Sequence, residues 1–186
     1  AAVLGRWGLD PAVLGGRSPG VSIARRFALL HPDRVLGLAL LDAQAGLEVE
    51  DKRGEYESMR SVWAEDGPSE LMAGMVAAII LGEYEGSPHW VQRWIARYPS
   101  GLGRIYSTLM DRDDITDRLS EIRAPALVVH GSDDAAIPMM RAEVLCAGLA
   151  GCSGVVVVAG GSHSANLNRP AAVNEAIAAF LAGLRG

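Results

Sequence analysis

The sequence lacks features that mark several common protein classes. Only two cysteines, Cys146 and Cys152, occur in 186 residues, which excludes a disulfide framework and a cysteine-rich zinc site. The longest apolar run, residues 71–81, is shorter than the roughly 18 residues that a membrane span needs. The first ten residues do not show the basic-then-apolar order of a secretory signal. We therefore expect a cytoplasmic protein without a membrane partner.

An excess of basic residues is also missing. The 17 arginines and lysines are outnumbered by 22 acidic residues, which gives a net charge of -5 and argues against nucleic acid as a partner. Hydrophobic residues make up 49% and charged residues 21% of the chain, as in ordinary globular proteins. This length and composition predict one domain.

Apolar segments with the character of buried strands alternate with segments that show helical periodicity. This alternation predicts an α/β fold with a mostly parallel sheet and helices on both faces. The predicted strands cover residues 11–16, 35–41, 126–130 and 155–159, and the predicted helices cover residues 1–9, 19–30, 138–150 and 170–184.

The region between the second and third predicted strands has a different character. It contains all four tyrosines and three of the four tryptophans, and its period is mostly helical. We interpret residues 43–117 as a helical cap inserted into a core formed by residues 1–42 and 118–186. The expected cap helices lie at about 48–66, 68–82, 88–97 and 101–111, and a short connecting helix is expected at 113–121.

The pentapeptide Gly16-Arg17-Ser18-Pro19-Gly20 matches G-x-S-x-G between a predicted strand and a predicted helix. On such a tight turn, a serine is exposed at the carboxyl end of its strand and can act as a nucleophile. The alternative is a glycine-rich turn in which Ser18 only caps the helix. The pentapeptide alone does not decide between the two.

Two further polar segments follow strands that are expected in the same sheet. Asp133 and Asp134 come after the third predicted strand, and His163 follows the fourth. Because the carboxyl ends of parallel strands share one edge, Ser18, an aspartate and His163 are predicted to meet there. A histidine could then take the serine proton while a carboxylate orients the imidazole.

With these motifs in this order, the chain resembles the α/β-hydrolase superfamily, and especially its 3-oxoadipate enol-lactonase-like and small-esterase branch. The family pattern selects Asp134, three residues after Gly131 and four before Pro138, as the acid. The resemblance implies hydrolysis of a carboxylic ester or lactone, with Ser18 as nucleophile and His163 as general base and then acid. It implies no cofactor and no metal. The resemblance covers almost the whole chain and includes residues 27–35, 41–46 and 113–119.

The sequence departs from the family pattern in two ways. One usual oxyanion donor is the backbone N–H of the residue after the nucleophile, and Pro19 has none. The chain also opens within a helical pattern, just ahead of the family's fifth strand, so the N-terminal part of the fold is expected to be missing. The alternatives are a non-catalytic or ligand-binding relative, half of a two-chain enzyme, or a lyase. A second copy or a partner chain is expected to cover the open sheet edge.

Several residues are candidates for contacts with a substrate. Trp63, Trp90, Trp94 and Met75 would line an apolar pocket in the cap, although ordinary helix packing is the favoured explanation for any one of them taken alone. Arg17 could bind a substrate carboxylate or could simply be solvated.

The remaining histidines and acidic clusters have simpler interpretations. His31 and His130 are expected to be structural, His89 to start a surface helix rather than to touch substrate, and Asp133 to support its turn. The aspartates between residues 111 and 117 are expected to cap a helix rather than to bind a metal.

Overall fold

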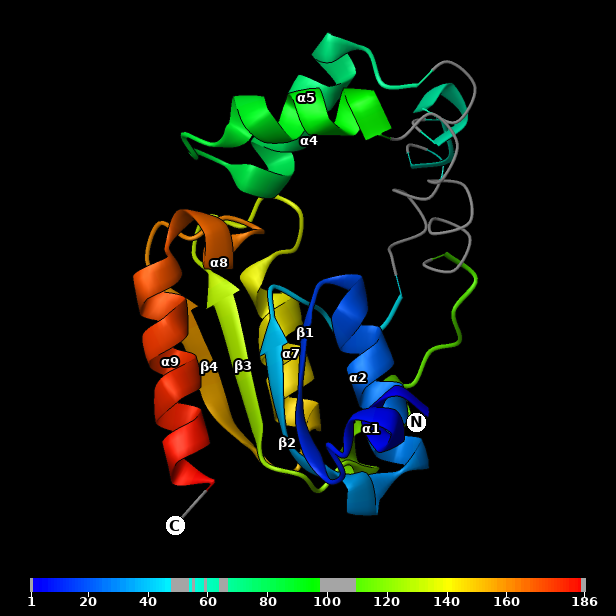
Figure 1. Cartoon of the computed structure of the whole chain (residues 1–186), viewed down its shortest axis with the longest axis vertical. Helices are drawn as coiled ribbons and strands as arrows, with labels where there is room; N and C mark the ends of the chain where they lie inside the picture. The colour runs from blue at the N-terminus through cyan, green and yellow to red at the C-terminus, as the bar shows by residue number, and fades with distance from the viewer. Residues whose placement is uncertain are drawn as a thin grey trace.

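The computed structural model describes residues 2–47, 54, 56–58, 60–63, 67–97 and 110–184. Their centre is a parallel sheet whose strands are adjacent in chain order (Figure 1). The strands are β1 (Ala12–Arg17), β2 (Val35–Leu41), β3 (Ala126–Gly131) and β4 (Cys152–Val158). The predicted α/β class with a parallel sheet is confirmed.

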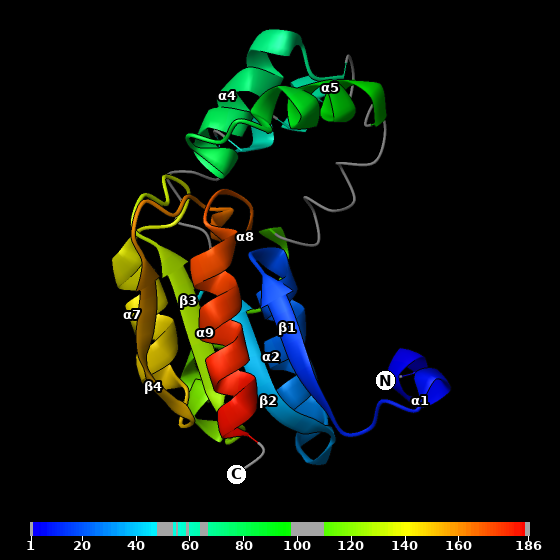
Figure 2. The ribbon, with the colours of Figure 1, turned by 60° about the vertical axis from the view of Figure 1, so that its left-hand side comes forward.

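Helices cover both faces of this sheet. The helices α2 (Pro19–Leu30) and α7 (Met139–Gly148) lie on one face, and α9 (Pro170–Gly183) lies on the other (Figure 2). Shorter elements are α1 (Ala2–Trp7), α8 (Ala165–Asn168) and the 3-10 helices η1 (Pro32–Arg34) and η2 (Thr116–Glu121). The predicted bounds of α2 and β2 agree with the structure, whereas β4 begins three residues before its predicted start and α8 was not predicted.

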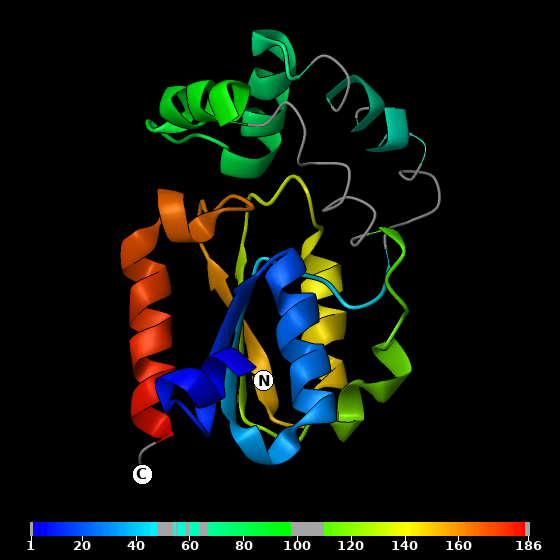
Figure 3. The same ribbon diagram turned by 45° about the vertical axis from the view of Figure 1, so that its right-hand side comes forward.

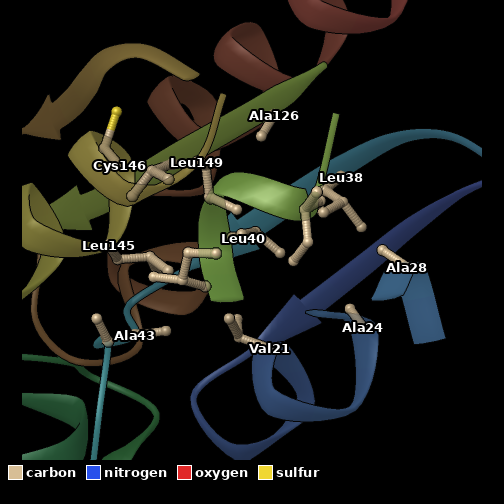
Figure 4. Packing of buried hydrophobic residues seen from close by; sticks show 14 of the residues in the cluster. Val21, Ala24, Ala28, Leu38, Leu40, Ala43, Ala126, Leu145, Cys146 and Leu149 are labelled. Carbon is tan, nitrogen blue, oxygen red and sulfur yellow. The ribbon is translucent and has the colours of Figure 1, made fainter. Parts of the chain in front are cut away.

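The strand β2 shows why the sheet needs both layers. Its residues Leu38 and Leu40 pack into the cluster formed with α2 and α7, part of which is drawn in Figure 4. The alternate residues Ala39 and Leu41 pack on the other face, in the cluster that contains Val173 of α9. Because successive side chains of a strand point to opposite faces, a strand buried on both sides is apolar throughout.

Two helices of the inserted region lie beyond the carboxyl ends of the strands (Figures 1 and 3). They are α4 (Glu70–Leu81), which begins where Ser69 Oγ accepts a hydrogen bond from Met72 N at 3.2 Å, and α5 (Ser87–Arg97). They confirm the predicted helices at 68–82 and 88–97. The predicted helix at 48–66 lies partly, and that at 101–111 mostly, outside the described residues.

The two cysteines form one disulfide, although the sequence predicted no disulfide framework. Cys146 of α7 is bonded to Cys152 at the start of β4. Within the described ranges, no helix is long and apolar enough to cross a membrane. The strand β1 forms one edge of the sheet. Coverage of this edge by a second copy or a partner chain remains a prediction.

Candidate active site

Ser18 lies on the sharp turn that joins β1 to α2. Its backbone has φ 50° and ψ -117°, an unusual conformation for a residue with a side chain. Gly16 permits the turn, because a Cβ there would lie 2.6 Å from the carbonyl carbon of Gly20. A Cβ on Gly20, by contrast, would meet nothing within 4 Å. Ser18 occupies the predicted N-cap position of α2, but its side chain makes no capping hydrogen bond, so capping does not account for the serine.

Three side chains from three strand ends form a continuous hydrogen-bonded array. Ser18 Oγ lies 2.9 Å from His163 Nε2, and His163 Nδ1 lies 2.9 Å from Asp134 Oδ2. The serine follows β1, the aspartate follows β3, and the histidine follows β4. The sequence predicted that these residues meet at one edge, and the structure brings them together there.

The surroundings of Asp134 determine which nitrogen of His163 carries the proton. Burial raises the pKa of Asp134, but the hydrogen bond and charge of His163 and the N–H of Ile137 outweigh it and lower the pKa below its usual value. Asp134 Oδ1 also accepts hydrogen bonds from the backbone N–H groups of Ala136 and Ile137, both at 2.8 Å. An ionised carboxylate can only accept, so His163 Nδ1 donates to it. His163 Nε2 is then left to accept from the Ser18 hydroxyl.

Asp42, at the end of β2, connects the loops that hold the other two partners. It is fully buried and has a positive φ of 46°. Its Oδ1 accepts from Gly131 N at 3.1 Å, in the segment before Asp134. Its Oδ2 accepts from Ala165 N at 3.2 Å, two residues after His163. Burial raises the pKa of Asp42 to about 6, although the Gly131 N–H and the charge of His163 act in the opposite direction.

Sequence reasoning gave Asp42 no role. An acidic residue directly after an apolar strand was the available signal, because that position lies on the same edge as Ser18. Its carboxylate binds both the loop after β3 and the loop after β4, which are far apart in the sequence.

Arg17 also holds the histidine loop. Its Nη1 donates to the backbone oxygen of His163 at 2.6 Å and to Ser164 Oγ at 2.8 Å. Burial lowers the pKa of Arg17, while the charges of Asp42 and Asp134 raise it. The guanidinium is therefore hydrogen-bonded to the loop that carries His163.

His130 lies beneath the array and is completely buried, as its structural interpretation requires. Its Nε2 is 2.9 Å from the Ile137 carbonyl, to which it donates. One potential metal-ligand atom from each of Asp42, His130 and Asp134 lies within 4.8 Å of the other two, close enough for the three to bind a metal ion. However, Asp42 holds two backbone N–H groups and Asp134 holds His163, so these side chains are already engaged and we infer no metal site.

A cavity of about 170 Å³ opens beside Ser18 and His163. The exposed surface of its described walls is mostly apolar, although several polar side chains line it, and Ile80 of α4 belongs to these walls. Pro19, the first residue of α2, also lines it and offers no N–H. The polar lining comprises Ser22, Arg25, Gln44, Tyr56 and Arg112, and the other apolar residues are Ala43, Ala136 and Ile137.

The five residues that the sequence proposed for substrate binding are not among the described lining residues of this cavity. Trp63 is buried, and Met75 is 61% exposed. Trp90 and Trp94 lie side by side on α5, with ring centroids 6.4 Å apart. Helical periodicity predicted that these two share a face but not where that face points. Their contact with substrate, like that of Arg17, stays a prediction.

Comparisons with known proteins identify the family of the chain. The sequence profile described as "Ndr family" matches residues 1–185. A 2-hydroxy-6-oxononadienedioate/2-hydroxy-6-oxononatrienedioate hydrolase of Burkholderia vietnamiensis is 30% identical over 151 residues. The match covers 75% of this chain and 51% of that protein, so the chain spans about half the length of this relative.

Two solved structures are similar along nearly the whole chain. A thermophilic esterase from Thermogutta terrifontis, with malate bound, has a TM-score of 0.87 at 24% identity, over 99% of this chain and 70% of its own. Est816, described as an N-acyl homoserine lactone degrading enzyme, has a TM-score of 0.69 at 26% identity, over 96% of this chain and 71% of its own. Fold and profile therefore lead to one assignment: the chain belongs to the Ndr family, within the α/β-hydrolase superfamily.

Proposed function

We propose that this chain carries the catalytic residues of a serine hydrolase that cleaves carboxylic esters or lactones. The observation that carries the proposal is the array of two 2.9 Å hydrogen bonds from Ser18 through His163 to Asp134, on a strained turn beside a cavity. A nucleophile, a base and a group that orients the base, within hydrogen-bond reach of one another, are what acyl transfer requires.

In this proposal, Ser18 Oγ attacks the ester carbonyl carbon while its proton passes to His163 Nε2. The ionised Asp134 stabilises the imidazolium that forms. His163 then gives the proton to the leaving alcohol oxygen as the carbon–oxygen bond breaks, which leaves an acyl group on Ser18. A water molecule, deprotonated by His163, releases the acid and restores the serine. With a lactone, the leaving alcohol stays attached to the acyl chain.

The helical insertion has a place in this proposal as a cap over the site. Ile80 of α4 contributes to the wall of the cavity that opens at Ser18. A cap residue in that position can select the acyl or alcohol group by shape. Est816, which is 26% identical and is described as degrading N-acyl homoserine lactones, supports the lactone part of the proposed substrate class.

Pro19 favours a second candidate function, that of a ligand-binding relative. The residue after the nucleophile has no N–H, so the backbone donor that usually faces the oxyanion is missing. Loss of one such donor costs roughly 10² to 10³ in turnover. The array could then hold a ligand without turning it over efficiently.

Labelling with a fluorophosphonate followed by intact-mass measurement tests the proposal. We expect one adduct on the wild type and on Ser153→Ala, a control serine exposed on β4. We expect no adduct on Ser18→Ala, and a loss of p-nitrophenyl acetate turnover of roughly 10⁴-fold or more. An unlabelled wild type that is folded would refute the hydrolase proposal. Labelling without ester turnover would favour the ligand-binding relative.

A further inference from the structure

Arg25 of α2 has no complete set of partners, although it is deeply buried. Only 3% of the residue is exposed to solvent. Within the described part of the chain, its Nε and Nη1 are buried without a hydrogen-bond partner. Its Nη2 makes only a long contact of 3.5 Å with Ser22 Oγ. At least two strong donors are therefore unsatisfied in the structure.

The guanidinium belongs to the wall of the cavity beside Ser18. Ser22 and Arg25 are three residues apart and share a face of α2, and Ser18 lies on the turn directly before this helix. Helical side chains lean toward the N-terminal end of their helix, so Arg25 extends toward the turn that carries Ser18.

The charges around this cavity favour an anion. Arg112 also lines it, with its Nη2 donating to the Gly46 carbonyl at 3.1 Å, and the described lining contains no acidic side chain. Asp114 acts on Arg25 through its charge, but its Oδ1 already accepts hydrogen bonds from Thr116. Asp114 therefore does not give Arg25 a partner that accepts two hydrogen bonds, and Arg112 is itself a cation.

A buried guanidinium without a partner is costly, and burial is the main reason why the pKa of Arg25 is lowered to about 10. Nearby Arg26 and Arg112 lower the pKa further through their positive charges, while Asp114 raises it. Arg25 still carries its charge at neutral pH. A carboxylate that enters the cavity could accept two parallel hydrogen bonds from the guanidinium and neutralise it.

We propose that Arg25 forms a subsite for a carboxylate group of the substrate, so that the ester is a half-ester or a lactone of a dicarboxylic acid. This inference rests on the proposed function of Ser18. Arg25 lies about two helical turns into α2, so about 10 Å of helix separates its backbone from the turn that carries Ser18, and the reach of the arginine side chain shortens that gap. A short methylene chain between carbonyl and carboxylate therefore fits the site.

The test compares two esters of the same shape and different charge. Monomethyl glutarate carries the carboxylate, and methyl glutaramate carries a neutral amide in its place. Initial rates measured in a pH-stat at pH 7.5 give kcat/KM for each ester. The variants are Arg25→Gln and a control, Arg118→Gln, in which an exposed arginine that is paired with Glu121 and is not among the described lining residues of the cavity loses the same charge.

We expect the wild type and Arg118→Gln to prefer monomethyl glutarate by about 10- to 100-fold. Arg25→Gln should lose this preference through kcat/KM for the anionic ester, with less than about threefold change for the neutral one. Its stability in urea should be unchanged or higher, because the substitution removes an unpaired buried charge. If Arg25→Gln does not fold, Arg25→Lys should retain part of the preference, since the charge is kept but the two-pronged contact is lost.

Equal use of both esters by the wild type, or an equal loss of both in Arg25→Gln, would overturn the subsite and leave the hydrolase proposal intact. If the wild type hydrolyses neither ester, calorimetric binding of glutarate to Ser18→Ala separates the two ideas. Binding that disappears when Arg25→Gln is added would support the subsite without hydrolysis. Absence of glutarate binding would overturn it.

Discussion

Replacement of Asp42 by asparagine removes a buried negative charge and keeps the size of the side chain. Asp42 is fully buried, and burial raises its pKa from 3.8 to about 6. The charges of His163 and His130 lower this pKa, and that of Asp134 raises it. Between these two pH values, the native protein holds a proton that the unfolded chain has released. The free energy of unfolding therefore falls as the pH rises through this window.

The size of the effect follows from the pKa. Each pKa unit corresponds to about 1.36 kcal/mol, so a change from 3.8 to about 6 corresponds to about 3 kcal/mol. The asparagine of the Asp42→Asn variant cannot titrate, and it resembles the protonated acid in having a single carbonyl-type acceptor oxygen. Because the other titratable groups are common to both proteins, most of their contribution cancels when wild type and Asp42→Asn are compared at each pH.

Urea denaturation followed by circular dichroism at several values between pH 4 and pH 8 measures this difference. We expect the stability of the wild type relative to Asp42→Asn to fall by about 2 kcal/mol from pH 4 to pH 7, because the unfolded carboxyl is already partly ionised at pH 4. Asp33→Asn, an exposed position in η1, is the control and should differ from the wild type by no more than about 0.5 kcal/mol at each pH. A flat difference curve for Asp42→Asn would refute the reasoning.

Two other substitutions examine the geometry of the site. Gly131→Ala should destabilise the protein by about 3 kcal/mol in urea denaturation, because its Cβ would lie 2.2 Å from the Gly161 carbonyl oxygen. The control is Gly154→Ala, whose Cβ meets nothing within 4 Å. Equal stability of the two variants would contradict the steric argument. Asp134→Asn should lower kcat by about 10⁴-fold in an ester assay with little change in KM, because the orienting carboxylate of His163 is lost; retained activity would remove Asp134 from the proposed mechanism.

The parts of the fold that could be predicted from sequence are those set by local patterns. The apolar run of β2 and the proline at the start of α2 fixed both elements to the residue. The meeting of Ser18, Asp134 and His163 followed from topology, because parallel strands bring their carboxyl ends to one edge. No knowledge of side-chain packing was needed for these inferences.

The remaining features depend on contacts between distant segments. Arg25 belongs to an Arg-Arg pair that any surface helix could carry, and only the packing of α2 against the core buries it. Arg17 was expected to contact a substrate or solvent, but its partners lie about 146 residues away in the sequence. The choice of cavity residues likewise depends on how the inserted helices are placed, which helical periodicity does not determine.

The turn at Ser18 has a consequence for how related sequences are searched. Its two glycines, Gly16 and Gly20, are not equally constrained, because a side chain would collide with the backbone only at Gly16. A pattern that requires glycine at both positions is therefore stricter than this turn demands. A search that fixes the first glycine and the serine, and admits any small residue at the last position, would retrieve proteins that share this geometry and that the stricter pattern discards.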